Sequence, residues 1–289
     1  MAGTTHFHSD WLLPDWPAPA GVRAVCTTRA GGLSLPPYDS LNLGLHVGDT
    51  VQAVAHNRRV LGQALGVAPV WMTQVHGTAL LQLNGQPQVP AATTNAGDAW
   101  ATPAALTAPI ADGAWTLDAG LVCTVMVADC LPVLLCSTDG TWVAAAHAGW
   151  RGLAGEGGAG ILESIFRSFS PGASVEQALA APELIAWLGP CIGPQAFEVG
   201  AEVCTAFLQA LVDPLQIAAV LDCFVPVGQG KFLADLPGLA RLRLAALGVT
   251  RVFGNDGRPP WCTVGNPSRF FSHRRDRVSG RLAACIWRG

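Results

Sequence analysis

Three apolar, strand-like segments follow one another closely in the middle of the chain, and they limit the possible fold more than any other feature. The segment 121–128 is almost continuously apolar, which is typical of a strand buried on both faces. We expect 132–136 to extend it past a kink, and 141–147 to form another strand. Segments with a helical apolar period flank them at 50–65 and 160–169. Buried strands between helices predict an α/β architecture.

The remaining segments add elements to this plan. We expect further strands at 21–29, 71–83, 184–188, 249–253 and 282–287, and further helices at 200–211 and 235–247. Residues 34–49 are dense in Pro, Gly, Asn and Asp, so a long structured loop is expected there. We interpret residues 1–20 as an N-terminal extension and the Ala-, Thr- and Pro-rich residues 86–107 as a surface insert. A chain of 289 residues can form one large domain or two fused halves.

Composition excludes several classes of protein. Half of the residues are hydrophobic, which excludes a disordered chain, and the formal net charge of −3 argues against a surface that binds nucleic acid or membrane. No apolar segment approaches the roughly 18 residues of a membrane-spanning helix, and the N-terminus lacks the pattern of a signal peptide. The nine cysteines include no CxxC pair, so we expect a cytoplasmic protein with reduced thiols.

Three residues in similar settings are candidate metal ligands. His76 in WMTQVHG, Cys130 in VMVADCLPV and His147 in VAAAHAGWRG each stand at or near the end of a strand-like segment. Strand ends that give way to irregular backbone are where α/β proteins build their sites. Two imidazoles and a thiolate form a suitable ligand set for Zn²⁺, with a fourth position left for water or substrate. A lone buried His or Cys is usually an ordinary core residue, so spacing alone favours that explanation over a metal site. Most other cysteines lie in apolar segments and are expected to be core residues.

Arginines form a second group of candidates. Arg29, Arg274 and Arg275 stand in segments that contain Gly or Ser, and Arg58 lies in HNRR. A planar guanidinium pairs bidentately with phosphate or carboxylate, so these residues predict an anion site. Each of them taken alone is also compatible with a solvated surface charge.

The ordered segments together resemble one family. The pieces that carry the resemblance are TTRAGGLSLPPYDSLNLGLHVGD, HNRRVL, WMTQVHG, ADG, ADCLPVLL, AAAHAGWRGL, LGPCIGP with FEVG, KFLADLPGLARLRLAALGV, and FFSHRRD followed by GRLAACIW. They are similar, in the same order, to the YfiH family, also called the laccase-domain or peptidoglycan-editing-factor family. The resemblance spans about residues 20–288, and residues 86–107 depart from it as an insert.

The resemblance implies a fold and a set of site residues. It implies a single layered α/β domain in which helices flank mixed β-sheets. Family members bind zinc through the residues that match His76, Cys130 and His147, and their active site includes the residues that match Asn42 and Arg58. Arg29, Arg274 and Arg275 remain expected binders of substrate or phosphate.

The resemblance also implies an activity. It implies phosphorolysis of adenosine, inosine, guanosine and methylthioadenosine, together with deamination of adenosine. The expected partners are therefore small molecules, purine nucleosides and phosphate, and we expect a monomer. Phosphorolysis needs an anion held below C1′ of the ribose, for which Arg58 with Arg29 or the pair Arg274–Arg275 is available. Asp129 is a candidate general acid or base, although a role in a turn explains it as well, and Cys191 is a candidate neighbour of the site.

Three alternatives belong to other classes. A copper polyphenol oxidase needs many His ligands in HxH pairs, and only His6 and His8 form such a pair here. Cu²⁺ would still bind a His–Cys–His site adventitiously, because it outcompetes Zn²⁺ at most such sites. A cysteine hydrolase would use Cys130 as nucleophile and a His as base, which suits the editing of a peptidoglycan precursor. A zinc-stabilised binding module without catalytic activity is the third.

Overall fold

The computed structural model describes residues 7–85, 108–169 and 183–289. The expected insert at 86–107 and the first six residues of the expected N-terminal extension lie outside these ranges. The described part of the extension packs on the domain, because Trp11 is buried and Leu12 exchanges backbone hydrogen bonds with Cys26.

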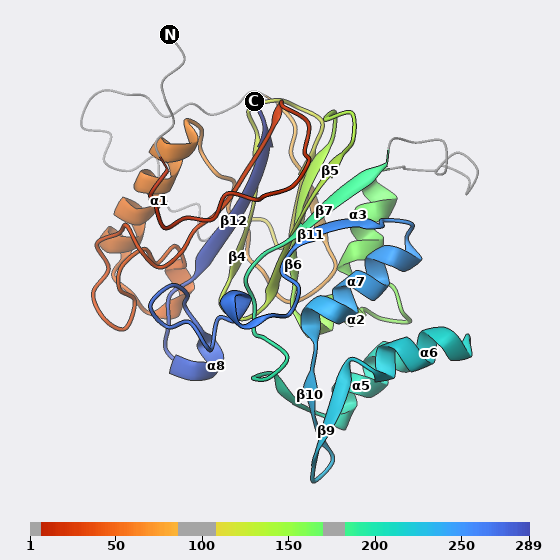
Figure 1. Ribbon diagram of the computed structural model, residues 1–289. Coiled ribbons are helices and arrows are strands. Elements are labelled where there is room, and N and C mark those ends of the chain that lie inside the picture. The colour runs from red at the N-terminus through yellow and green to blue at the C-terminus, as the bar shows by residue number, and fades with distance from the viewer. Residues whose placement is uncertain (1–6, 86–107, 170–182) are drawn as a thin grey trace, which may run out of the picture.

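A mixed six-stranded sheet runs through the centre of the molecule (Figure 1). In spatial order its strands are β11 (Arg251–Gly254), β7 (Leu184–Leu188), β5 (Leu131–Ser137), β6 (Val143–Ala148), β3 (Gly113–Thr116) and β2 (Leu80–Gln82). The central pairs β5–β6 and β5–β7 are antiparallel, whereas the pairs at both edges are parallel. Strands β5, β6 and β7 are buried along their whole length, which explains their nearly unbroken apolar sequences.

A three-stranded antiparallel sheet packs against the central one. Its order is β1 (Val22–Cys26), β12 (Leu282–Arg288) and β4 (Val122–Val127). The space between the sheets is filled by apolar side chains from both, including Val125, Leu134 and Ile286. Helix α1 (Val51–Leu65) covers the outer face of the smaller sheet through Leu61 and Leu65.

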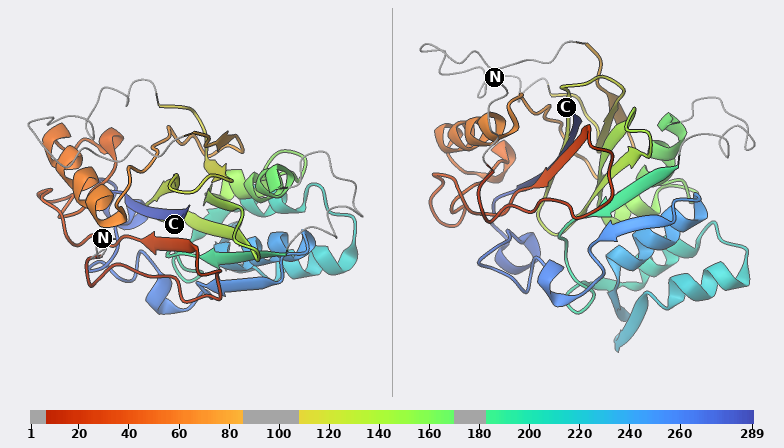
Figure 2. Two further views of the ribbon diagram at one scale, coloured as in Figure 1. Left: turned by 90° about the horizontal axis from the view of Figure 1, so that it is seen from above. Right: turned by 45° about the horizontal axis from the view of Figure 1, so that its top comes forward.

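Helices on the other side complete the layers, as the view from above shows (Figure 2). They are α2 (Trp150–Ala154), α3 (Ile161–Phe169), α5 (Ala201–Leu208) and α7 (Leu236–Ala246). A small sheet of β8 (Glu198–Gly200), β10 (Lys231–Ala234) and β9 (Phe224–Gly228) extends from this side together with α6 (Pro214–Leu221). The short elements η1 (Leu45–Val47), η3 (Pro259–Trp261) and α8 (His273–Asp276) lie in loops. The expected layered α/β single domain with mixed sheets is confirmed. No helix in the described ranges is long and apolar enough to cross a membrane.

Two expectations about strands are wrong. Residues 132–136 do not extend the preceding strand, because β4 and β5 belong to different sheets and the chain reverses between them. Asp129 makes this reversal with a φ of 88°, a value that only Gly adopts without strain. The segment 71–83 forms a strand only at Leu80–Gln82; its first part is irregular. Both departures occur where the candidate site residues lie.

Candidate active site

Two chain reversals bring the three candidate metal ligands together. His76 stands in the irregular segment before β2, with a φ of 63°. Cys130 follows the reversal between β4 and β5, and His147 is the buried fifth residue of β6. The Sγ atom of Cys130 lies 3.6 Å from Nε2 of His76, and the ligand atoms of all three residues lie within 4.8 Å of one another. The sequence prediction that these residues form one cluster agrees with this geometry.

Asp112 holds two of the three ligands from a fully buried position. Its Oδ1 atom is 2.8 Å from Nδ1 of His147, so Nε2 of that imidazole is left for the cluster. The same carboxylate accepts backbone hydrogen bonds from Val75, His76 and Gly77 at 3.2, 2.8 and 2.7 Å. One side chain therefore fixes the ring of His147 and the strained backbone that presents His76.

The donor set and its spacing fit a bound metal. Zn–S and Zn–N bonds of about 2.3 and 2.0 Å in a tetrahedron place S and N roughly 3.5 Å apart, close to the 3.6 Å between Cys130 and His76. Packing behind the cluster is equally tight. A Cβ atom added to Gly149 would lie 2.8 Å from the His76 ring and 3.0 Å from the Cys130 sulfur. These three residues can therefore hold a divalent metal, as the carboxylate–His–metal arrangement of Asp112 and His147 also indicates.

Charges inside the cluster favour a thiolate. Burial alone would raise the pKa of Cys130, but His147 and His76 outweigh burial and lower this pKa to about 6. Burial likewise acts to lower the pKa of His147, and Cys130 and Asp112 raise it above its ordinary value. Burial also acts to raise the pKa of Asp112, whereas hydrogen bonds from His147 and Gly77 lower it overall. Cys130 is therefore held as a thiolate, which is the form that binds metals and reacts with electrophiles.

Alkylation can test whether the pKa of Cys130 is lowered. In protein stripped of metal with a chelator, we expect iodoacetamide to modify Cys130 with a rate that rises through a midpoint near pH 6 and then levels off, because the thiolate is the reacting form. Mass spectrometry of the labelled peptide measures the rate at each pH. Cys223 is the control, because burial raises its pKa to about 12 and it should stay unlabelled. A midpoint near 8.5, the value of an ordinary thiol, would contradict the close pairing of Cys130 with the two imidazoles.

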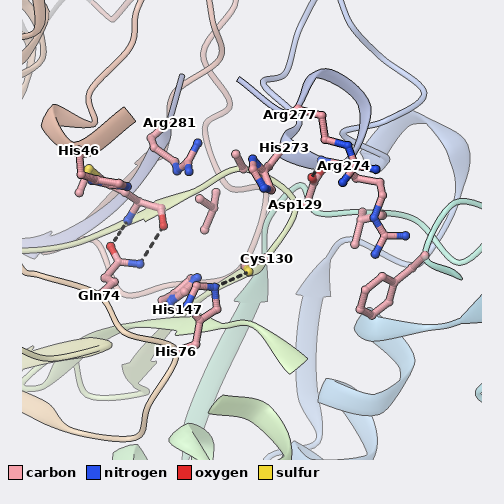
Figure 3. Close-up of a pocket in the computed structure, with 15 residues that line it drawn as sticks. His46, Gln74, His76, Asp129, Cys130, His147, His273, Arg274, Arg277 and Arg281 are labelled. Carbon is pink, nitrogen blue, oxygen red and sulfur yellow. Dashed lines mark hydrogen bonds between the residues drawn. The ribbon is translucent and has the colours of Figure 1, made fainter. Parts of the chain in front are cut away.

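The cluster opens into a cavity of about 310 Å³ (Figure 3). Backbone and apolar side chains form one part of its wall, and basic side chains form another: His46, His273, Arg274, Arg277 and Arg281. His273 and the arginines stand across the cavity from the His–Cys–His cluster. Gln74 also lines the cavity, but its amide exchanges two hydrogen bonds with the backbone of Met126, at 2.9 and 2.7 Å. The cavity thus has one end with metal ligands and another with positive charge.

The predicted arginines lie in different places. Of the four, only Arg274 lines this cavity. Arg29 donates to the backbone oxygens of Asp39 and Pro267 at 2.7 Å each. Arg275 donates to the backbone oxygen of Thr263 at 2.7 Å and pairs with Asp276. These two guanidinium groups are thus occupied by the protein itself.

Asn42 and Arg58 are buried behind the cavity wall. The Oδ1 atom of Asn42 accepts from the backbone N–H of Arg281 at 2.9 Å. Arg58 donates to the backbone oxygen of Leu43 at 3.0 Å and its guanidinium lies 3.9 Å above the Trp71 ring. Asn42 thus holds the backbone at Arg281, and Arg58 holds the segment that leads to His46.

Two further predicted neighbours also have protein partners. Asp129 lines the cavity, but its carboxylate accepts from Thr263 Oγ1 at 2.5 Å and from the backbone N–H of Arg274 at 2.6 Å. Cys191 is fully buried and accepts a hydrogen bond from Asn255. The contacts of Asp129 agree with the turn role that the sequence left open.

Sequence reasoning missed several residues of the site. Asp112 was noted only as part of ADG, and Arg277, Arg281 and His46 were not singled out. The ADG segment, one of the segments that carry the family resemblance, was the available signal for Asp112. Nothing in the local sequence separates Arg277 from its neighbours Arg274 and Arg275, because the difference lies in which carbonyl groups surround each guanidinium.

A comparison with protein families decides the family. The sequence model described as multi-copper polyphenol oxidoreductase laccase matches residues 23–289. The chain belongs to this family. Within the laccase family, a Pseudomonas aeruginosa protein named purine nucleoside phosphorylase is 46% identical, and the match covers 96% of this chain and 98% of that protein. The Escherichia coli protein named purine nucleoside phosphorylase YfiH is also 46% identical, with 96% and 99% covered. The family resemblance read from the sequence is confirmed.

Solved structures agree with the assignment to the laccase family. The Neisseria meningitidis protein NMB0706 superimposes with a TM-score of 0.75 at 40% identity, covering 96% of this chain and 99% of that one. YlmD from Geobacillus stearothermophilus gives a TM-score of 0.79 at 31% identity, with 98% and 97% covered. The layered fold is therefore shared along nearly the whole chain.

Proposed function

We propose that this protein is a metal-dependent purine nucleoside phosphorylase. The observation that carries the proposal is the two-ended cavity, in which a His–Cys–His cluster faces a group of basic side chains. The names of relatives at 46% identity support the same activity. We propose zinc as the metal, and adenosine, inosine, guanosine and methylthioadenosine as substrates. We propose a cytoplasmic monomer, and the nine free thiols support a reducing compartment.

Phosphorolysis places two electrostatic demands on this cavity. Phosphate must be held near C1′ of the ribose, and the purine that leaves develops negative charge. The arginine end of the cavity supplies the positive charge that holds phosphate. His46 supports the second, because burial, with the charges of Arg281 and Arg58, lowers its pKa and keeps it neutral at pH 7. A neutral imidazole both donates and accepts hydrogen bonds, as contact with a purine requires.

The roles of the remaining residues follow from their contacts. His76, Cys130 and His147 would hold the metal, which when bound supplies Lewis acidity toward an acceptor atom of the substrate. Deamination of adenosine at this end is part of the proposal. Asn42 and Arg58 act from behind the wall by holding the backbone near Arg281 and His46 in place. Arg274 contributes charge at the anion end; for Arg29 and Arg275 we propose an effect through the loops that they brace.

A nucleoside panel assayed with and without phosphate tests the function. We expect release of hypoxanthine from inosine to require phosphate and to yield ribose 1-phosphate in equal amounts, because the anion is the nucleophile. Chromatography of base and sugar phosphate measures both products. Equal release of base without phosphate would instead identify a hydrolase. Oxidation of a polyphenol by protein loaded with stoichiometric copper, in the absence of nucleoside turnover, would favour an oxidase.

Two observations bear on the other candidate activities. The structure's described residues contain one cluster of three or more possible His, Cys, Asp or Glu ligands, whereas a multicopper oxidase needs several copper sites. The depressed pKa of Cys130 next to His76 is what a cysteine hydrolase would need. Alkylation of Cys130 in metal-loaded protein distinguishes a cysteine hydrolase from a metal-dependent enzyme, because a free nucleophile reacts and a metal ligand is protected.

A further inference from the structure

The basic side chains at the anion end of the cavity differ in how far the protein already uses them. Arg274 donates to the backbone oxygen of Glu198 at 3.0 Å, and its guanidinium lies 5.6 Å from the centre of the Phe197 ring. Arg281 uses Nη1 for the backbone oxygens of Ser279 and Gly280. The side chain of Arg277 makes no hydrogen bond or ion pair within the described part of the chain, although it lines the cavity. Its guanidinium is therefore fully available.

The backbone at Arg277 is strained. Its φ and ψ are 61° and −54°, and the N–H of Val278 donates to the oxygen of Asp276 across it at 2.7 Å. This is the classic γ-turn, which is rare and unfavourable for a residue with a Cβ atom. A strained conformation persists where the surroundings over-determine it, and such positions gather at functional sites. Glycine would satisfy this turn without strain, so the presence of arginine calls for a role of its side chain.

The carboxylates near these arginines already have other partners. Asp129 accepts from Thr263 and from the backbone of Arg274, as described above. The carboxylate of Glu198 pairs with Lys231 at 2.6 Å. Across the described ranges, neither Arg277 nor Arg281 forms an ion pair with a carboxylate. A partly enclosed cavity lined by two guanidinium groups that form no ion pair with a described carboxylate favours a dianion.

Arg281 is held in place from behind. Its backbone N–H donates to Asn42, which is itself fixed by Asp49 at 2.9 Å and by the backbone of Gly44. Its guanidinium is partly buried and lies close enough to Cys130 for their charges to interact. Figure 3 places Arg281 on one side of His273, and Arg274 with Arg277 on the other. Arg277 and Arg281 both line the cavity, and His273 stands between them.

We infer that a phosphate dianion binds between Arg277 and Arg281, with His273 as a further donor. The inference rests on the proposed function and assigns its phosphate site to residues that the sequence motifs did not indicate. Bidentate guanidinium contacts from two sides fit the tetrahedral oxygens of phosphate. The nucleoside then lies between this anion and the His–Cys–His cluster.

Direct titration of the metal-loaded protein with inorganic phosphate tests the site. We expect Arg277→Gly and Arg281→Gln each to weaken phosphate binding by about tenfold or more, since each removes a charge-assisted contact. The melting temperature of Arg277→Gly should stay the same or rise, because glycine relieves the strained turn. A purely structural role of Arg277 predicts the opposite, a lower melting temperature with unchanged phosphate affinity. Arg167→Gln is the matched control, because Arg167 is an exposed arginine of α3 outside the cavity.

Kinetics and a second probe separate the possible outcomes. In the phosphorolysis assay, the variants should raise the KM for phosphate about tenfold and change the KM for inosine less than about twofold. Unchanged phosphate affinity in both variants, or no phosphate binding by the parent protein, overturns the inference while leaving phosphate-dependent activity as a separate result. Phosphate binding that both variants lose supports the site even if no nucleoside is cleaved. Inosine 5′-monophosphate tests a phosphate ester as occupant: binding tighter than that of free phosphate, and lost in both variants, assigns the site to an ester.

Discussion

Cys130→Ala should abolish stoichiometric metal binding and reduce phosphate-dependent base release by more than about a thousandfold. The reason is that the thiolate is the one anionic ligand of the cluster, and two imidazoles alone bind a divalent metal weakly and leave its charge uncompensated. Elemental analysis of protein purified without added metal gives the stoichiometry, and a base-release assay gives the rate. Full metal content with retained activity in this variant would refute the assignment of the metal centre.

A matched cysteine controls for general effects of the substitution. Cys223 is half-buried, like Cys130, and lies away from the cavity, where its sulfur contacts the backbone oxygen of Ala219. Cys223→Ala should keep both metal and activity. Thermal unfolding of both variants, compared at the same metal content, shows whether loss of activity reflects loss of the fold.

Asp112→Asn should weaken metal binding by about 10- to 100-fold, although Asp112 is not itself a ligand of the cluster. The amide carries no charge to stabilise His147. Its NH₂ group cannot accept a hydrogen bond, so the N–H of His76 loses its acceptor if NH₂ replaces Oδ1, and the N–H of Gly77 loses its acceptor if NH₂ replaces Oδ2. Buried donors left without partners should also lower the free energy of unfolding by about 1–3 kcal/mol. Competition with a chromophoric chelator measures the affinity, and urea unfolding of the metal-free protein measures the stability.

Asp139→Asn is the control for that substitution. Asp139 also accepts several hydrogen bonds in a tight turn, from Ser137 and Thr141, but it is exposed and distant from the ligands. Its replacement should leave metal affinity unchanged. If Asp112→Asn lowered stability and left metal affinity intact, Asp112 would have only a structural role.

Much of the fold could be predicted from apolar pattern. The strands β5, β6 and β7 are buried on both faces, and burial on both faces produces the continuous apolar sequences that identify them. The separation of β4 from β5 was missed because nothing in the sequence shows that Asp129 adopts a positive φ. An aspartate between two apolar segments is also compatible with a kink within one strand. The small sheet was missed because the residues of β9 after Phe224 are exposed, so no alternation of burial marks it.

The metal cluster could be predicted and the anion site could not, for a physical reason. Histidine and cysteine at strand ends made a ligand set one candidate, and the resemblance to the YfiH family then singled out these three residues. Arginine is common, and its role depends on whether nearby carbonyl groups already occupy its guanidinium. Arg29 and Arg275 are occupied in this way, whereas Arg277 has no such partner among residues 7–85, 108–169 and 183–289. Only three-dimensional contacts distinguish them.

The position of β12 determines when during synthesis this site can form. This last strand lies between β1 and β4, and Arg277 and Arg281 immediately precede it. While residues 282–288 are still inside the ribosome, the smaller sheet lacks its middle strand, and the loop that bears the arginines is not yet held at its C-terminal end by that strand. His76, Cys130 and His147 emerge much earlier and can assemble around β5 and β6 first. A nascent chain can therefore acquire its metal ligands well before it acquires a complete cavity, so catalytic competence begins only once β12 has joined the smaller sheet.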